Sequence, residues 1–208
     1  AEKFVLEAKR LQNVELLGYH CHIGSQVFDR DGALYLDAAD VMLRFAARMY
    51  RDHGVELRML NLGGGYGVRY TVSDPVVDIA GNLRALAAHV KHVVHALGLP
   101  MPAILMEPGR SSVADAGMTL YTVGSVKQIP AYKNYVSVDG SMADNPRYAL
   151  YRSAYTVYLA NKMEQRADFF CDLVGRCCES GDVIQPGIFL PKPERGDIIG
   201  VCTTGAYN

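Results

Sequence analysis

The feature that most constrains the fold is an alternation of short apolar runs and longer amphipathic segments in the first 115 residues. The short runs are residues 14–20, 57–62 and 103–106. The longer segments, about 33–53 and 79–97, repeat apolar residues at intervals of three and four. That spacing lines one face of a helix, whereas short apolar runs are typical of buried strands. Strands that alternate with helices favour a parallel sheet, either open or closed into a barrel.

The second half of the chain has a different pattern. From about Met118, β-rich runs such as MTLYTVGSVKQI, DFFCDLVG and GDIIGVCTT are separated by turns rich in Pro, Gly and Asp. Such runs predict a mainly antiparallel β-barrel or sandwich. We therefore expect an α/β part over residues 1–115 and a β domain over 116–208, with a helical insertion near 146–163.

Composition and charge exclude several classes of protein. The formal net charge of −1 gives no electrostatic reason to expect nucleic acid or an anionic membrane as a partner. No apolar run approaches the roughly 20 residues that a membrane-spanning helix needs, and no signal peptide is evident. The five cysteines are odd in number and form no Cys-x-x-Cys pair, which favours reduced thiols and a cytoplasmic protein.

The first apolar run ends in the sequence HCHIGSQ, which carries several polar groups. His20 and His22 are two residues apart, so they face the same side of a strand. The two rings could be packed structural histidines. They could also be a metal-ligand pair, although that reading needs further ligands, and Glu107 is the only acid at the third strand end. A third possibility is a ring stacked on a flat cofactor, with Ser25 donating to an anion.

Two further motifs follow the other apolar runs of the first half. Gly63, Gly64 and Gly65 would let backbone N–H groups approach a phosphate, but the Lys-Ser/Thr of a nucleotide-binding P-loop is absent. Glu107 and Arg110 in EPGRS could form an ion pair, or the acid could hold a ring nitrogen while the guanidinium binds an anion. A stacking ring, a phosphate loop and a partner for a ring nitrogen together match pyridoxal phosphate.

Six motifs occur in an order that resembles the diaminopimelate decarboxylases, a family of fold-type III pyridoxal phosphate enzymes: HIGSQ, NLGGGYG, EPGRS, DGSMADNPRYALY, CCESGD and TTGAY. The resemblance covers essentially the whole chain. It implies the C-terminal part of a (β/α)8 TIM-like barrel followed by the β domain. It also implies a cytoplasmic homodimer with shared active sites and a role in the last step of lysine biosynthesis.

The resemblance also implies roles for individual residues. His22 stacks on the cofactor ring, and Glu107 binds its pyridine nitrogen. The phosphate and its surroundings involve Ser25, Gly63, Gly64, Gly65, Gly109 and Arg110, and Tyr207 touches both cofactor and substrate. No metal is implied.

The remaining implied residues bind the substrate, meso-diaminopimelate, which carries a second amino-acid head at its far end. Guanidinium groups suit the distal carboxylate, so Arg110 and Arg147 are expected there with Tyr151. Glu179 suits the distal ammonium. Cys178, entering the partner subunit's site, is the expected acid that protonates the carbon losing CO2.

The chain also departs from the family pattern. The family's Schiff-base lysine lies on the first barrel strand, and no lysine here has that context. Tyr148 and Ser141 replace the usual proline and glycine of their motifs. We therefore expect a central-to-C-terminal fragment that is inactive and of low stability by itself.

Alternative functions remain at this point. Another fold-type III decarboxylase could act on ornithine, arginine or carboxynorspermidine, and a non-catalytic relative could regulate a partner. A barrel hydrolase built on a metal at His20 and His22 is a further alternative. The adjacent Cys177 and Cys178 would point to opposite faces of a strand, so a disulfide between them is disfavoured and Cys177 is expected to pack inside.

Overall fold

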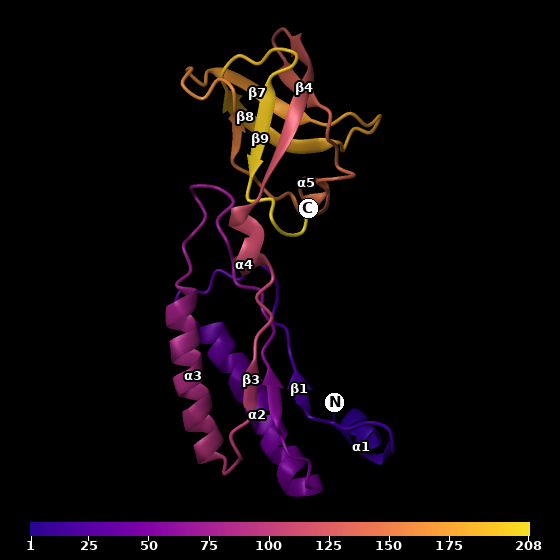
Figure 1. Ribbon diagram of the computed structural model, residues 1–208, viewed down its shortest axis with the longest axis vertical. Helices are drawn as coiled ribbons and strands as arrows, with labels where there is room; N and C mark the ends of the chain where they lie inside the picture. Colours follow the sequence, from indigo (N-terminus) through magenta and orange to yellow (C-terminus); the bar gives the residue numbers. More distant parts are fainter. The chain divides into compact units, whose positions relative to one another are not determined.

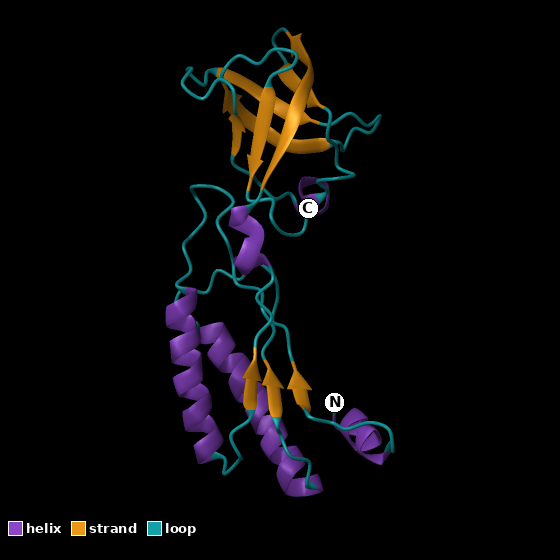
Figure 2. Cartoon of the chain, viewed as in Figure 1, coloured by secondary structure: helices purple, strands orange, loops and turns teal.

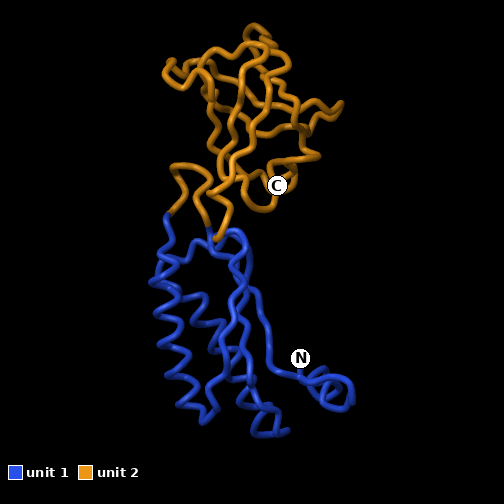
Figure 3. Tube along the Cα trace, viewed as in Figure 1, with its two compact units in different colours: residues 1–67, 76–111 blue, residues 68–75, 112–208 orange.

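The computed structural model describes all 208 residues, and Figures 1 and 2 show its helices and strands. The chain divides into two compact units, coloured separately in Figure 3. The first unit comprises residues 1–67 and 76–111, and the second comprises residues 68–75 and 112–208. No helix is both long enough and apolar enough to cross a membrane.

The first unit is a three-stranded parallel sheet with helices. The strands lie in the order β1-β2-β3. Their bounds are β1 Gly18–His20, β2 Met59–Asn61 and β3 Ala103–Leu105. Its helices are α1 Glu2–Arg10, α2 Ala33–His53 and α3 Ile79–Ala96. The short helix α4, Arg110–Val113, begins in this unit and ends in the second one.

Apolar periodicity explains how these elements pack. Every third or fourth residue of α2 and α3 is buried, and most of these positions share one core with Leu60 and Leu62 from β2 and its end. Glycines in the left-handed region flank α2, namely Gly32 and Gly54. The N-terminus of α3 is capped because the Asp78 carboxylate accepts a hydrogen bond from the Gly81 N–H at 2.8 Å.

The second unit is a six-stranded mixed sheet in the order β6-β9-β4-β5-β7-β8. All neighbouring pairs are antiparallel except β5–β7, which is parallel. The edge strands β6 and β8 also contact each other, so the sheet is nearly closed. The strands are β4 Met118–Ile129, β5 Lys133–Val138, β6 Val157–Leu159, β7 Phe169–Val174, β8 Val183–Leu190 and β9 Ile198–Cys202.

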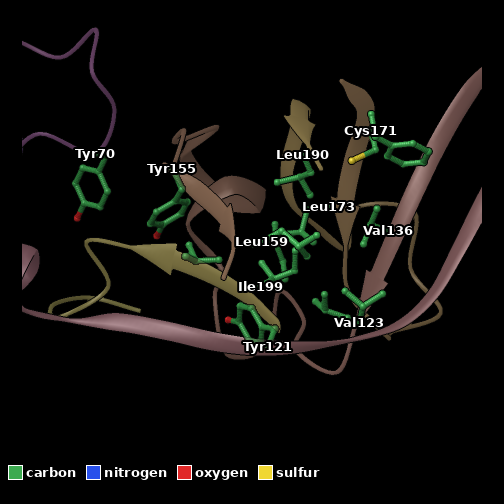
Figure 4. Close-up of a cluster of buried hydrophobic side chains, with 14 residues drawn as sticks. Tyr70, Tyr121, Val123, Val136, Tyr155, Leu159, Cys171, Leu173, Leu190 and Ile199 are labelled. Carbon is green, nitrogen blue, oxygen red and sulfur yellow. The ribbon is translucent and has the colours of Figure 1, made fainter. Parts of the chain in front are cut away.

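The core of the second unit fills the inside of this sheet. Figure 4 shows Leu159, Leu173 and Ile199 pointing toward one another from three different strands. Tyr70, from the segment 68–75, packs edge-on against Tyr155 with ring centroids 5.4 Å apart. This contact explains why that segment belongs to the second unit. A 3-10 turn, η1 Ala114–Ala116, precedes β4.

The predicted helical insertion near 146–163 is wrong in its extent. The structure has only the short helix α5 Arg147–Tyr151, and the chain then forms β6. The helix ends because Arg152 adopts a left-handed conformation, with φ 55°. The apolar residues beyond it pair with β9 instead, since Val157 and Tyr158 are β-branched and aromatic residues that favour strands.

Candidate functional site

Polar side chains gather at the carboxyl edge of the first unit's sheet. Asn61, the last residue of β2, donates from Nδ2 to Glu107 Oε1 at 2.7 Å. His20, the last residue of β1, places Nε2 3.4 Å from Glu107 Oε2. Because parallel strands end at the same edge, residues distant in sequence meet there. Both side chains of the His20–Glu107 pair are about half exposed, so Glu107 remains accessible to a ligand.

The three glycines of NLGGGYG let the strand-end loops come unusually close. A Cβ on Gly64 would lie 1.9 Å from the Glu107 carbonyl oxygen. A Cβ on Gly65, which has φ +91°, would lie 1.9 Å from the carbonyl oxygen of Gly24. At Gly63 the nearest atom would be the Cys21 carbonyl oxygen, at 2.7 Å. Only glycine fits these three positions, so the loops after β1, β2 and β3 form one close-packed backbone surface.

His22 and Ser25 belong to the same surface. The Gly64 N–H lies 3.4 Å from His22 Nδ1 in hydrogen-bond geometry, which makes that ring nitrogen an acceptor. Arg110, at the start of α4, donates from Nη2 to Ser25 Oγ at 3.3 Å. The structure therefore brings together, at one sheet edge, the predicted residues His22, Ser25, Gly63, Gly64, Gly65, Glu107, Gly109 and Arg110.

Sequence reasoning missed Tyr35, which supports the glycine loop. Tyr35 is 1% exposed, and its hydroxyl donates to the Gly64 carbonyl oxygen at 3.1 Å. Its ring stacks on Tyr66, with centroids 4.4 Å apart, and burial raises the pKa of Tyr35. The side chain therefore stays a neutral donor. Its sequence context, one apolar position in a helical stripe, gives no sign of this role.

The second unit holds the other predicted residues. Arg147 is 6% exposed, although an arginine is seldom buried without an acidic partner. Its guanidinium donates to the hydroxyls of Tyr70 and Ser153, the latter at 3.0 Å, and lies 4.3 Å above the Tyr70 ring. Arg147 Nε has no hydrogen-bond partner. The structure thus contains a buried cation whose contacts are all neutral.

Three more of the predicted residues, Tyr151, Tyr207 and Glu179, lie at the surface of this unit. Tyr151 and Tyr207 are largely exposed, and Tyr207 has a left-handed backbone with φ 60°. The Glu179 carboxylate folds onto its own loop, where Oε1 accepts from the Gly181 N–H at 3.2 Å. Exposure leaves all three side chains accessible to a ligand or to another chain.

The cysteine pair lies in a loop, so the strand geometry expected for it is wrong. Strand β7 ends at Val174, before Cys177 and Cys178, because the residues that follow are small and polar turn formers. Both thiols are free and exposed, which also corrects the expectation that Cys177 packs inside. Exposure leaves the Cys178 thiol available to an approaching ligand or chain.

The five cysteines should differ sharply in reactivity. Burial raises the pKa of the Cys171 thiol to about 12, so it stays protonated and shielded in the core. Iodoacetamide at about pH 8 should modify Cys177 and Cys178 in the native protein much faster than it modifies Cys171. Site-resolved mass spectrometry measures this. Equal labelling of Cys171 under native conditions would contradict the burial, and labelling in denaturant provides the reference.

Comparison with known proteins places this arrangement in a family. The sequence profile described as "Pyridoxal-dependent decarboxylase, pyridoxal binding domain" matches residues 1–114, more than half of the chain. The chain belongs to the pyridoxal-dependent decarboxylase family. The matched region contains the whole strand-end cluster of the first unit. No group of three or more His, Cys, Asp or Glu side chains is arranged to hold a metal ion.

Relatives within this decarboxylase family match the chain over its whole length. The chain is 44% identical over 208 residues to a diaminopimelate decarboxylase of Bacillus methanolicus, covering 100% of this chain and 48% of the relative. The crystal structure of a diaminopimelate decarboxylase from M. jannaschii in complex with L-lysine is similar with a TM-score of 0.83. Its identity is 29%, covering 100% of this chain and 46% of that one. The chain spans about half the length of the relatives it matches.

The strand-end cluster has the donors and acceptors that pyridoxal phosphate requires. A carboxylate at Glu107 suits a protonated ring nitrogen, and the Ser25 hydroxyl with the Arg110 guanidinium suits a phosphate. The glycine loop fits as well, since any Cβ there would fill the space between neighbouring backbones. The residues present therefore fit the cofactor that the family name implies.

Proposed function

We propose that this chain is part of a protein that binds pyridoxal phosphate and decarboxylates meso-diaminopimelate to L-lysine and CO2, the last step of lysine biosynthesis. The observation that carries the proposal is the cluster of Glu107, Ser25, Arg110 and the glycine loop at one sheet edge. It occurs in a chain that is 44% identical to a diaminopimelate decarboxylase. The enzyme would be a carboxy-lyase.

The first unit would hold the cofactor. Glu107, held by Asn61, would accept a hydrogen bond from the protonated ring nitrogen, and His22 would lie against the ring. The phosphate would be held by Ser25, Gly63, Gly64, Gly65, Gly109 and Arg110. Bound there, pyridoxal phosphate would supply the electron sink for the electron pair of the broken carbon–carbon bond.

The second unit would supply substrate recognition and the proton. The buried, acid-free guanidinium of Arg147 suits a carboxylate, and Arg110 with Tyr151 would share the distal carboxylate. Glu179 would bind the distal ammonium, and Tyr207 would contact cofactor and substrate. The exposed Cys178 thiol would deliver the proton to the carbon that loses CO2.

The same proposal extends to architecture and setting. Residues 1–115 would form the C-terminal part of a TIM-like (β/α)8 barrel, and residues 116–208 would form the β domain. The unpaired outer edges of β1 and β3 support barrel closure by further strands, because open parallel sheet edges are normally covered. The protein would be a cytoplasmic homodimer in which Cys178 and Glu179 serve the partner subunit's site.

An assay of the full-length protein tests the function. Purified with pyridoxal phosphate, it should release CO2 from meso-diaminopimelate and form L-lysine, while L-ornithine should turn over at least about 100-fold more slowly, because the unfilled distal site leaves buried polar groups unpaired. CO2 release and amino-acid analysis measure both reactions. Preference for ornithine, arginine or carboxynorspermidine would favour the other decarboxylases. Cofactor binding without any turnover would favour a regulatory relative.

A further inference from the structure

Two loops of the second unit leave the sheet side by side. Strands β5 and β7 are its only parallel pair, with Ser137 opposite Val174, so their carboxyl ends lie at the same edge. The loop after β5 leads to Arg147, and the loop after β7 carries Cys178 and Glu179. The backbones of the two loops also touch, since the Arg176 N–H donates to the Gly140 carbonyl oxygen at 3.1 Å.

One buried carboxylate joins these two loops. Asp182 is 3% exposed, and its Oδ1 accepts from the Met142 N–H at 2.6 Å. Its Oδ2 accepts from the Cys177 N–H, also at 2.6 Å. Each oxygen therefore serves a different loop. The space around the carboxylate is closed, because a Cβ on Gly175 would lie 2.4 Å from both oxygens.

The environment of Asp182 makes this connection strong. Hydrogen bonds from N–H groups to an ionised carboxylate are shorter and stronger than those between neutral groups. The partners of the Asp182 carboxylate are backbone N–H groups rather than a lysine or arginine side chain. Burying a carboxylate without a cation has a substantial desolvation cost, which only good hydrogen bonds offset. Asp182 is therefore held in place by the two loops that it joins.

We propose that Asp182 is a positioning residue that sets the loop of Cys178 and Glu179 against the loop that leads into Arg147. This inference rests on the proposed function, because it assigns substrate contacts to both loops. The anchored Cys177 N–H immediately precedes Cys178, and the anchored Met142 lies five residues before Arg147. One side chain thereby fixes the backbone just before the proton donor, Cys178, and the start of the segment that leads to Arg147.

Replacing Asp182 with asparagine in the full-length protein tests this role. The two N–H groups bind different carboxylate oxygens, and an amide has an NH2 group in place of one of them, so one N–H group would face a donor instead of an acceptor. We expect kcat/KM for meso-diaminopimelate to fall about tenfold, because loss of alignment weakens positioning. We also expect iodoacetamide to modify Cys178 about threefold faster or more, since the loop is released.

Asp172 provides a matched control in the same sheet. It is also buried, and its carboxylate accepts from the Gly187 N–H at 2.8 Å and pairs with Lys133 at 2.7 Å. Asp172→Asn should lower the melting temperature of the protein by an amount comparable to Asp182→Asn. It should leave kcat/KM and the Cys178 labelling rate within about twofold of wild type, because it touches neither loop.

The outcomes separate this proposal from the proposed function. Equal losses of kcat/KM in the two variants, or an unchanged Cys178 labelling rate in Asp182→Asn, would overturn the positioning role. If wild type does not act on diaminopimelate, the proposed function fails, and the labelling comparison still decides whether Asp182 holds the loop. If Asp182→Asn does not fold, Gly175→Ala displaces the same carboxylate sterically, and faster Cys178 labelling is again expected.

Discussion

Alanine at Gly65 is expected to weaken binding of pyridoxal phosphate to the full-length protein by about 100-fold or more and to abolish most of the proposed decarboxylase activity. The new Cβ would lie 1.9 Å from the Gly24 carbonyl oxygen and 3.1 Å from the His22 ring. A backbone oxygen cannot move aside as a flexible side chain can. The loops after β1 and β2 must therefore separate, which takes Ser25 and the glycine N–H groups out of register with one another.

The matched control for this change is Gly196→Ala. Gly196 has the same φ of +91°, but a Cβ there would meet no atom within 4 Å. Both variants thus carry the cost of a left-handed alanine, about 1–2 kcal/mol, and only Gly65→Ala adds the collision. Equilibrium dialysis of the cofactor and thermal melting measure the two effects. Equal cofactor affinities for the two variants would show that the close approach of the loops is unimportant.

Local periodicity was sufficient to predict the two long helices and the three strands of the first unit. The stripes over 33–53 and 79–97 correspond to α2 and α3, and the apolar runs contain β1, β2 and β3. These elements are predictable because the spacing of apolar residues within a helix or a buried strand depends on which of its faces is buried. The order of the motifs along those elements also indicated which strand ends carry polar residues.

Features that depend on contacts between residues distant in sequence could not be predicted from local periodicity. Tyr35 reaches the Gly64 carbonyl across 29 residues, and Asp182 reaches Met142 across 40. Tyr35 has the local pattern of an ordinary core position, and Asp182 has that of an ordinary turn residue. The parallel pairing of β5 with β7 is equally hidden, because alternation along one strand does not identify its neighbour.

The predictions of a long helical insertion and of a cysteine pair on a strand were wrong for a local reason. A helical insertion was expected over about 146–163, but the backbone of Arg152 is left-handed and the helix ends after five residues. The apolar CC dipeptide suggested a continuing strand, whereas the following polar and glycine residues form a turn. In both cases the end of an element depended on turn residues that periodicity does not record.

Neutralising Arg147 with glutamine should separate substrate recognition from stability. The buried guanidinium has only neutral hydrogen-bond partners, so its cation is desolvated without an anion. The glutamine side chain would remove that cost while losing one hydrogen bond and the cation–π contacts with Tyr70 and Tyr155, which together stabilise by about 1–2 kcal/mol. These effects oppose each other, and we expect the melting temperature of the full-length protein to change by less than about 4 °C.

Ligand binding should respond much more strongly to the same substitution. L-lysine, the proposed product, keeps the distal carboxylate of diaminopimelate, whereas cadaverine has the same chain without it. Removing one partner of a buried charge pair costs about 2–5 kcal/mol, which corresponds to a loss of L-lysine affinity of at least about 30-fold. The affinity for cadaverine should stay within about threefold of wild type, because cadaverine has no carboxylate to offer Arg147.

Arg152→Gln is the matched control, since it changes the net charge equally at the other end of the same short helix. Arg152 is exposed and lies 5.1 Å above the Tyr148 ring, outside the buried cluster. Its replacement should leave the L-lysine affinity within about twofold of wild type. Calorimetric titration of both ligands into the three proteins tests the assignment. If Arg147→Gln unfolds the protein at unchanged lysine affinity per folded molecule, the arginine is structural; if lysine and cadaverine weaken equally, it does not bind the distal carboxylate.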